Sequence, residues 1–173
     1  MAGSLIKIDE EIVTSAVASV TLTGIDSTYD VYMVKINNWI PTTDNQLAYA
    51  RVTVSGTPDT TANYDKAYKL LRSNTSFGNN TSTNDTQVHF NIFSGNDTGE
   101  NTNAVLYLFN FNNASEYSFF TTEFSGMSGA GNLTGAQGGV VHTVAQACDG
   151  IQFYFSSGNI DTGAKFTLYG LKK

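Results

Sequence analysis

Cysteine, proline and histidine are scarce in this sequence of 173 residues, which has one cysteine, two prolines and two histidines. The single cysteine, Cys148, excludes a disulfide within the chain and a zinc site built from several cysteines. Neither histidine has another good metal ligand at the spacing of a known motif. We therefore expect no metal and no other cofactor.

Long apolar segments and basic clusters are also missing. No apolar run approaches the roughly 18–20 residues that a membrane-spanning helix needs, and residues 1–7 lack the basic start and apolar core of a signal peptide. Charged residues make up 14% of the chain and give a net charge of −6. Because nucleic acids and anionic membranes both require a basic face, the sequence predicts neither as a partner.

What fills the chain instead is a series of short segments in which apolar and polar residues alternate, separated by turns rich in Gly, Asn, Ser and Thr. A period of two is typical of half-buried β-strands. The expected strands are 17–23, 29–36, 47–55, 87–93, 104–109, 117–124, 139–145, 151–155 and 165–171. Their number and spacing predict an all-β fold, a jelly-roll-like sandwich of two antiparallel sheets.

Three segments fit this pattern less well. Residues 60–72 have apolar side chains at both helical and strand spacing, so we expect a short helix or an irregular edge segment there. Residues 73–86 and 125–139 are long and polar, and the second is rich in glycine. Both are too long for a tight hairpin, and we expect exposed loops.

The first 15 residues precede the first alternating segment, and we expect them to form an extended arm ahead of a single domain over 16–173. The arm has enough apolar residues to add a strand to a neighbouring protein. Its candidate assembly residues are Leu5, Ile6, Ile8, Ile12 and Val13.

Several strands are apolar on both faces. Leu106 and Leu108 fill one face of segment 104–109, while Val105, Tyr107 and Phe109 fill the other. Because a two-layer sandwich buries only one face of each sheet, the surplus predicts a homo-oligomer, with a trimer as one option. The candidate interface residues are Trp39, Tyr64, Tyr68, Leu106 and Leu108. Trp39 also has two alternatives, packing in the core and contact with a glycan.

No arrangement of residues in the sequence points to catalysis. Carboxylate pairs such as Asp26 and Asp30 flank turns, where Asp caps the backbone, and a Gly-x-Ser-x-Gly motif is missing. Cys148 precedes a strand and has no electropositive neighbours, so we expect a buried, unreactive thiol. The polar stretch 96–101 matches no calcium-binding loop and is expected to be a turn. We expect that the chain is not an enzyme.

Five segments, taken in order, resemble a known β-sandwich module. They are TGIDSTYDVY at 23–32, IPTTDN at 40–45, RVTVSG at 51–56, GIQFYFSSGNI at 150–160 and FTLYGLK at 166–172. This set is similar to modules of virion structural proteins of marine and cyanobacterial bacteriophages. The resemblance covers residues 15–172, and 56–140 correspond to the part in which such modules vary most. It implies a role as a capsid decoration or fibre-type protein and carries no catalytic motif.

These observations lead to two alternative functions. The first is a structural protein on the exterior of a bacteriophage virion, made in the host cytoplasm, most simply a capsid decoration or head-fibre component. Its partners would be the major capsid protein or fibre neighbours, and other copies of itself. The alternative is a receptor-binding module of the tail that recognises a glycan on the host surface.

Overall fold

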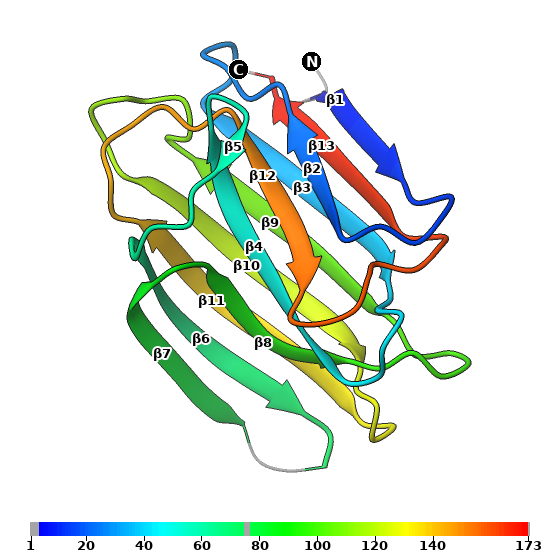
Figure 1. Cartoon of the computed structure of the whole chain (residues 1–173). Coiled ribbons are helices and arrows are strands. Elements are labelled where there is room, and N and C mark those ends of the chain that lie inside the picture. Colours follow the sequence, from blue (N-terminus) through cyan, green and yellow to red (C-terminus); the bar gives the residue numbers. More distant parts are fainter. Residues whose placement is uncertain (1–3, 75–76, 173) are drawn as a thin grey trace.

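The structure is a computed structural model that describes residues 4–74 and 77–172, which form two antiparallel β-sheets packed face to face (Figure 1). The predicted all-β sandwich is therefore confirmed. The strands are β1 (Leu5–Ile12), β2 (Ser19–Thr23), β3 (Val31–Trp39), β4 (Gln46–Val54), β5 (Thr57–Pro58), β6 (Tyr64–Arg72), β7 (Gly78–Asp85), β8 (Val88–Ser94), β9 (Thr102–Phe109), β10 (Ser118–Met127), β11 (Leu133–His142), β12 (Gly150–Phe155) and β13 (Lys165–Leu171). No described residue belongs to a helix that could cross a membrane.

The two sheets differ in size. The larger sheet has eight strands in the order β1-β13-β3-β9-β10-β11-β6-β7, and the smaller sheet has five, with β4 at its centre between β12 and the strands β5 and β8. Figure 1 shows the smaller sheet in front of the larger one. Because the smaller sheet lies on one face only, the opposite face of the larger sheet is left uncovered by the part of the chain that the structure describes.

The core lies between the sheets and is built by alternation along the strands. In β3, β9 and β10 every second side chain is buried and the intervening ones reach the surface. Trp39, at the end of β3, is fully buried at the centre of this core. Five phenylalanine rings lie with their centroids 5.0 to 6.5 Å from the Trp39 ring, and these are Phe90, Phe124, Phe153, Phe155 and Phe166.

The expected N-terminal arm is instead the first edge strand of this chain's own sheet. Strand β1 pairs with β13 from Leu5 opposite Leu171 to Ile12 opposite Lys165, with a bulge between Lys7 and Asp9. Val13 is buried, and its backbone N–H donates to the carbonyl of Ala164 over 2.9 Å. The alternation in 5–12 thus reflects pairing within the chain, and no arm extends from the domain over the described residues.

The three ambiguous segments also form strands. Residues 64–72 are β6, whose alternating burial follows the strand spacing and not the helical one. The predicted loop 73–86 contains β7, an edge strand held by backbone pairing to β6 despite its polar side chains. Most of the predicted loop 125–139 extends β10 and β11, leaving only a short connection between Met127 and Leu133.

Candidate interaction surface

The uncovered side of the eight-stranded sheet, called the outer face below, consists of the side chains that point away from the smaller sheet. Three of its rows cross the strands at the registers of the backbone pairing. The first row holds Val31, Phe109, Phe119 and Val141, and the second holds Tyr169, Met33, Tyr107, Thr121 and Gly139. These two rows are mostly apolar, although solvent faces them.

Several aromatic side chains on the outer face are exposed to solvent. Tyr107 is 39% exposed, Phe119 is 44% exposed and Tyr117, just before β10, is 47% exposed. Contiguous apolar patches of this kind are uncommon on soluble monomers and mark sites of interaction. Tyr and Phe are also enriched in the cores of protein interfaces. The outer face is therefore the candidate functional surface of this chain.

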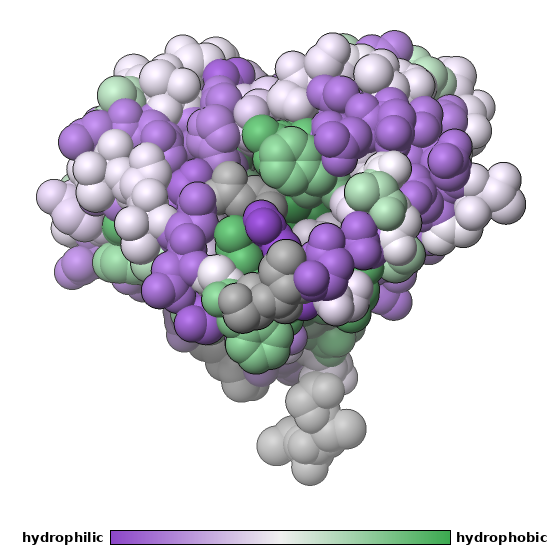
Figure 2. All heavy atoms as spheres, turned by 90° about the horizontal axis from the view of Figure 1, so that it is seen from below, coloured by the Kyte–Doolittle hydropathy of each residue, from purple (hydrophilic) through white to green (hydrophobic). Residues whose placement is uncertain are grey.

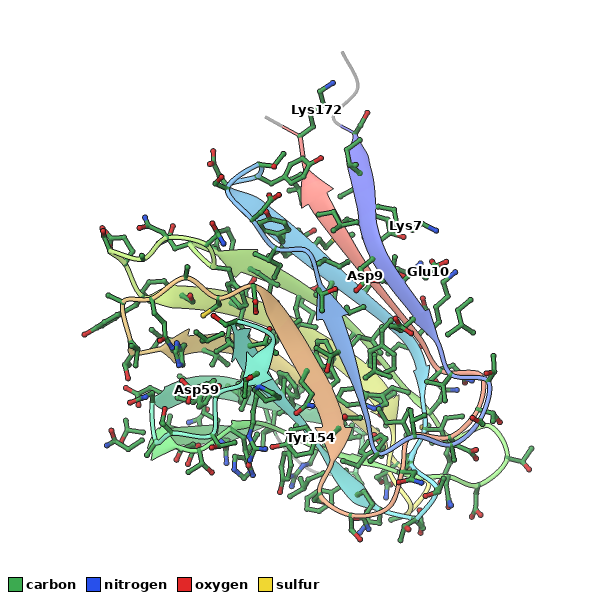
Figure 3. The ribbon with its side chains drawn as sticks, turned by 45° about the horizontal axis from the view of Figure 1, so that its top comes forward. Lys7, Asp9, Glu10, Asp59, Tyr154 and Lys172 are labelled. Carbon is green, nitrogen blue, oxygen red and sulfur yellow. The ribbon has the colours of Figure 1, made fainter. Side chains whose placement is uncertain are left out.

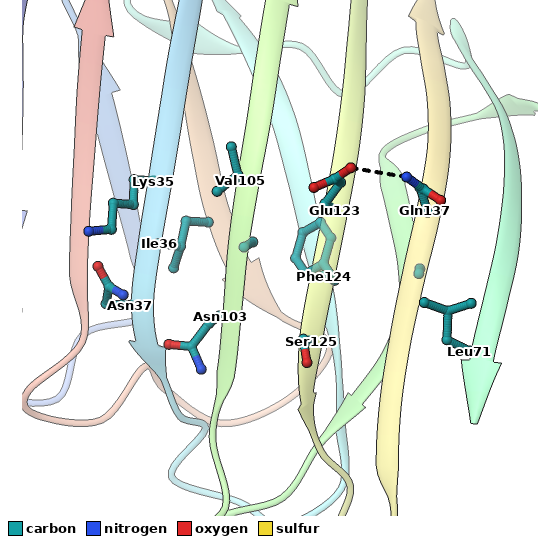
Figure 4. A pocket seen from close by; sticks show the side chains of 12 residues that line it. Lys35, Ile36, Asn37, Leu71, Asn103, Val105, Glu123, Phe124, Ser125 and Gln137 are labelled. Carbon is teal, nitrogen blue, oxygen red and sulfur yellow. Dashed lines mark hydrogen bonds between the residues drawn. The ribbon is translucent and has the colours of Figure 1, made fainter. Parts of the chain in front are cut away.

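The third row across the outer face is charged (Figure 4). Lys35 on β3 lies beside Val105 on β9, and Val105 lies beside Glu123 on β10. Gln137 on β11 donates a hydrogen bond of 3.0 Å from Nε2 to Oε1 of Glu123, and Lys69 follows on β6. A positive and a negative charge thus flank a central valine.

Two shallow hollows lie on the outer face. The first, of about 470 Å³, crosses its middle from Lys35 on β3 past Val105 on β9 to Leu71 on β6. The second, of about 520 Å³, is bordered by Phe119, Val141 and Ala67 and has Gly139 in its floor. The second hollow follows from the small side chains at Gly139 and Ala67, which leave the backbone of the sheet uncovered.

The outer side of the smaller sheet has a different chemistry. Its aromatic residues are partners of one another and of polar groups: Tyr49 packs edge-on against Tyr154, and Arg51 lies over the Tyr154 ring at 5.0 Å. The Tyr154 hydroxyl, labelled with its residue in Figure 3, donates to Gln87 over 3.0 Å. Phe93 on β8 is the exposed aromatic residue among those described on this side, at 40%, whereas Tyr49 and Tyr154 have partners within the chain.

Strand β1 forms one edge of the outer face and carries three of the predicted assembly residues at the surface. Leu5, Ile6 and Ile12 are exposed, whereas Ile8 packs against the core and Val13 is buried. Charges accompany these apolar residues along the edge (Figure 3). Charges and a bulge on an edge strand discourage open-ended pairing with other sheets.

Glu10 on β1 joins the strand to its neighbour by ion pairs. One carboxylate oxygen lies 2.9 Å from Lys165 Nζ and the other lies 3.2 Å from Lys7 Nζ. Hydrogen bonds from Lys165 and then Lys7 hold the pKa of Glu10 below its usual value. Glu10 therefore stays negatively charged at the end of the charged row.

None of the five predicted interface residues reaches the outer face. Trp39, Tyr64, Leu106 and Leu108 are at most 1% exposed, and Tyr68 is 4% exposed. Because a buried side chain cannot contact another chain, these residues are core residues, and of the three roles expected for Trp39 the structure shows packing in the core. On the same strand β9, the exposed Tyr107 and the half-buried Val105 and Phe109 lie on the opposite face, as the alternation predicted.

A buried polar cluster ties the end of β11 to the segment before β6. His142 is fully buried, and its Nε2 lies 2.8 Å from Oδ2 of Asp59. The Tyr64 hydroxyl donates to the carbonyl of Asp59 over 2.9 Å. Burial alone would raise the pKa of Asp59, but hydrogen bonds from Thr61 and then His142 lower it below the usual value.

This cluster predicts an acid-sensitive contribution to stability. Because the pKa of Asp59 is lower in the folded chain, its stabilisation is present above the unfolded pKa of about 4 and is lost as the pH falls through the folded value. We expect Asp59→Asn to lower the free energy of unfolding by about 1–3 kcal/mol at neutral pH, with a smaller difference at about pH 3. Denaturant unfolding at both pH values measures this, with Asp97→Asn as an exposed control, and a pH-independent difference would contradict it.

Two further features bear on chemistry. Cys148 is fully buried, and burial raises the pKa of its thiol to about 11, which agrees with the predicted unreactive cysteine. Within residues 4–74 and 77–172, no group of three or more His, Cys, Asp or Glu side chains is placed to hold a metal ion.

The end of the sandwich where β6 ends and β11 begins is also hollowed. Viewed from this end, apolar surface lies in a hollow between two polar lobes (Figure 2). A pocket of about 250 Å³ at this end is lined partly by Phe93, Leu133 and Arg72. It is smaller than either hollow of the outer face.

Comparisons with known proteins add little to this geometry. No protein-family model and no curated protein matches the chain. Among solved structures, a variant of fructofuranosidase from Schwanniomyces occidentalis in complex with fructosylnystose aligns with a TM-score of 0.28 and 8% sequence identity. The alignment covers 98% of this chain and 34% of the fructofuranosidase chain. A likeness this weak carries no argument about fold or function.

Proposed function

We propose that this chain is a structural protein on the exterior of a bacteriophage virion, a capsid decoration or head-fibre component that performs no catalysis. The observation that carries the proposal is the uncovered outer face, where exposed aromatic rings lie on the eight-stranded sheet. Such a face suits broad contact with other protein molecules, since a standard interface takes roughly 800 Å² from each partner. The resemblance of residues 15–172 to virion modules is the reason for placing this function on a virion.

The partners in this proposal are other virion proteins, such as the major capsid protein or a fibre neighbour, and other copies of the chain. The protein would be made in the host cytoplasm and built into the particle there. The alternative is a tail module that binds host glycans, which the exposed rings of Tyr107 and Tyr117 favour because an aromatic ring can stack on the apolar face of a sugar.

A loading experiment tests the proposal. Phage carrying Phe119→Asp in this chain are expected to contain at least about tenfold less of it than wild-type particles, because a charge in the centre of an apolar contact is strongly unfavourable. Quantitative mass spectrometry of purified particles measures the copy number. Phe93→Asp, which changes a similarly exposed phenylalanine on β8 of the smaller sheet, is the control and should load normally.

The outcomes separate the two functions. Absence of the wild-type chain from purified particles contradicts the proposal. Particles that load both variants normally show that the outer face is not the contact. Binding of the isolated chain to host glycans, lost on Tyr107→Ala while loading stays normal, would favour the glycan alternative.

A further inference from the structure

We propose that the outer face pairs two copies of this chain across a two-fold axis that runs along β9, with Lys35 of each copy opposite Glu123 of the other. This inference rests on the proposed function, because it gives the outer face a definite partner. It is argued from the area of the face, from its charge pattern and from its shape.

The area of the outer face matches what a stable dimer needs. The strands β1, β13, β3, β9, β10, β11 and β6 span about 29 Å at the usual strand separation, and eight residues of strand span about 26 Å. Their product is about 750 Å² of sheet before side chains are counted, close to the roughly 800 Å² that each partner contributes to a standard interface. Two copies of one sheet have the same twist, so they can pack in the aligned manner of stacked sheets.

The charged row is complementary to itself about Val105. Lys35 lies one strand to one side of Val105 and Glu123 lies one strand to the other side. A two-fold axis along β9 exchanges these sides, so each Lys35 faces Glu123 of the second copy. Farther out, Glu10 and Lys69 lie three strands from Val105 on opposite sides and face one another by the same symmetry.

The two inner charges have no counter-ion among the residues that the structure describes. The Lys35 side chain makes no hydrogen bond or ion pair with them, and the side-chain partner of Glu123 is the neutral Gln137 amide. Strand β9 lies between them, so about 10 Å of sheet keeps Lys35 and Glu123 of one copy apart. Stacked sheets lie about 10 Å apart, a gap that the long Lys and Glu side chains together can span.

The two halves of the outer face are also complementary in shape. Tyr169 and Met33 are bulky and lie on β13 and β3, whereas Gly139 lies two strands beyond β9 on the other side. A side chain added at Gly139 would meet no atom within 4 Å. The same two-fold axis places Tyr169 of one copy over the 520 Å³ hollow at Gly139 of the other.

Charge reversal tests this register. Sedimentation equilibrium of the full chain is expected to give a dimer of twice the 18.6 kDa chain mass. Lys35→Glu or Glu123→Lys alone puts like charges opposite one another twice per dimer, and each is expected to weaken dimerisation about a hundredfold. The double variant Lys35→Glu/Glu123→Lys restores both pairs and should dimerise like the wild type. A mixture of the two single variants should form the mixed dimer although neither pairs with itself.

Matched controls keep net charge from explaining the result. Lys172→Glu changes the net charge by the same amount as Lys35→Glu, and Asp97→Lys changes it by the same amount as Glu123→Lys. Lys172 and Asp97 are both exposed and lie away from the charged row. Both controls should dimerise normally. Gly139→Leu, which fills the hollow without a change of charge, should weaken the dimer as well. Circular dichroism confirms that each variant is folded.

A wild-type chain that stays monomeric, a trimer, or a dimer that neither single reversal weakens overturns this inference. A monomer whose Phe119→Asp variant still fails to load onto particles contradicts the pairing and leaves the proposed function in place. A chain that dimerises as described but is absent from purified particles contradicts the proposed function and leaves the pairing in place.

Discussion

Replacing Trp39 with alanine is expected to destabilise the domain more than any other single substitution in the core, by about 3–5 kcal/mol. The side chain is fully buried among five phenylalanine rings from both sheets. Its removal leaves a cavity at the point where the sheets meet. Since domains are stable by about 5–15 kcal/mol in total, a loss of this size approaches global unfolding.

Phenylalanine at the same position is the matched control for this experiment. The Trp39 Nε1 has no hydrogen-bond partner among the described residues, so Trp39→Phe loses volume but no hydrogen bond and should cost less than half as much as alanine. Urea unfolding followed by far-ultraviolet circular dichroism compares the two. An alanine variant as stable as the phenylalanine variant would show that the core does not depend on this ring.

Removing residues 1–12 is expected to have the second large effect. The deletion takes away the whole of β1, its backbone bonds to β13 and the packing of Ile8 on the core. It also removes Asp9, whose carboxylate accepts a hydrogen bond of 2.7 Å from the backbone N–H of Thr23. With several hydrogen bonds lost at about 1 kcal/mol each, we expect at least about 3 kcal/mol of destabilisation and a melting temperature lower by about 6–12 °C.

The newly exposed edge of β13 should also make the truncated chain prone to aggregation, because an open strand edge pairs with other chains. Thermal melts and size-exclusion chromatography measure both effects. Removal of residues 1–4 alone keeps β1 and is the control. A chain without residues 1–12 that melts like the wild type would mean that the segment is dispensable for folding, as a free arm would be.

Alternation in the sequence was enough to predict the fold class and most strands, because a half-buried strand has apolar residues on one face and polar residues on the other. Alternation could not show which face of a strand points into the core when both faces are apolar. Leu106 and Leu108 alternate with Val105 and Tyr107, and both sets are apolar, so the choice depends on the side to which the smaller sheet packs. Polar edge strands such as β7 left no signal, since their bonds to β6 are made by the backbone.

The candidate site was not visible in the sequence for a related reason. Lys35, Val105 and Glu123 come from three separate segments and meet only through the registers of β3, β9 and β10. Those registers are fixed by long-range pairing, which a pattern read along one segment does not contain. The first strand was predicted as a free arm, and neither its pairing with β13 nor the packing of Ile8 and Val13 within the chain was foreseen.

The pairing of β1 with β13 brings the beginning of the first strand next to the end of the last, with the carbonyl of Ser4 3.3 Å from the backbone nitrogen of Lys172. A reporter or antigen fused at either end would thus emerge from the same corner of the molecule. A short linker across this corner would close the backbone into a ring that could be reopened in an exposed turn such as 96–99. The neighbouring ends of the two strands therefore make the domain suitable as a scaffold that displays fused proteins.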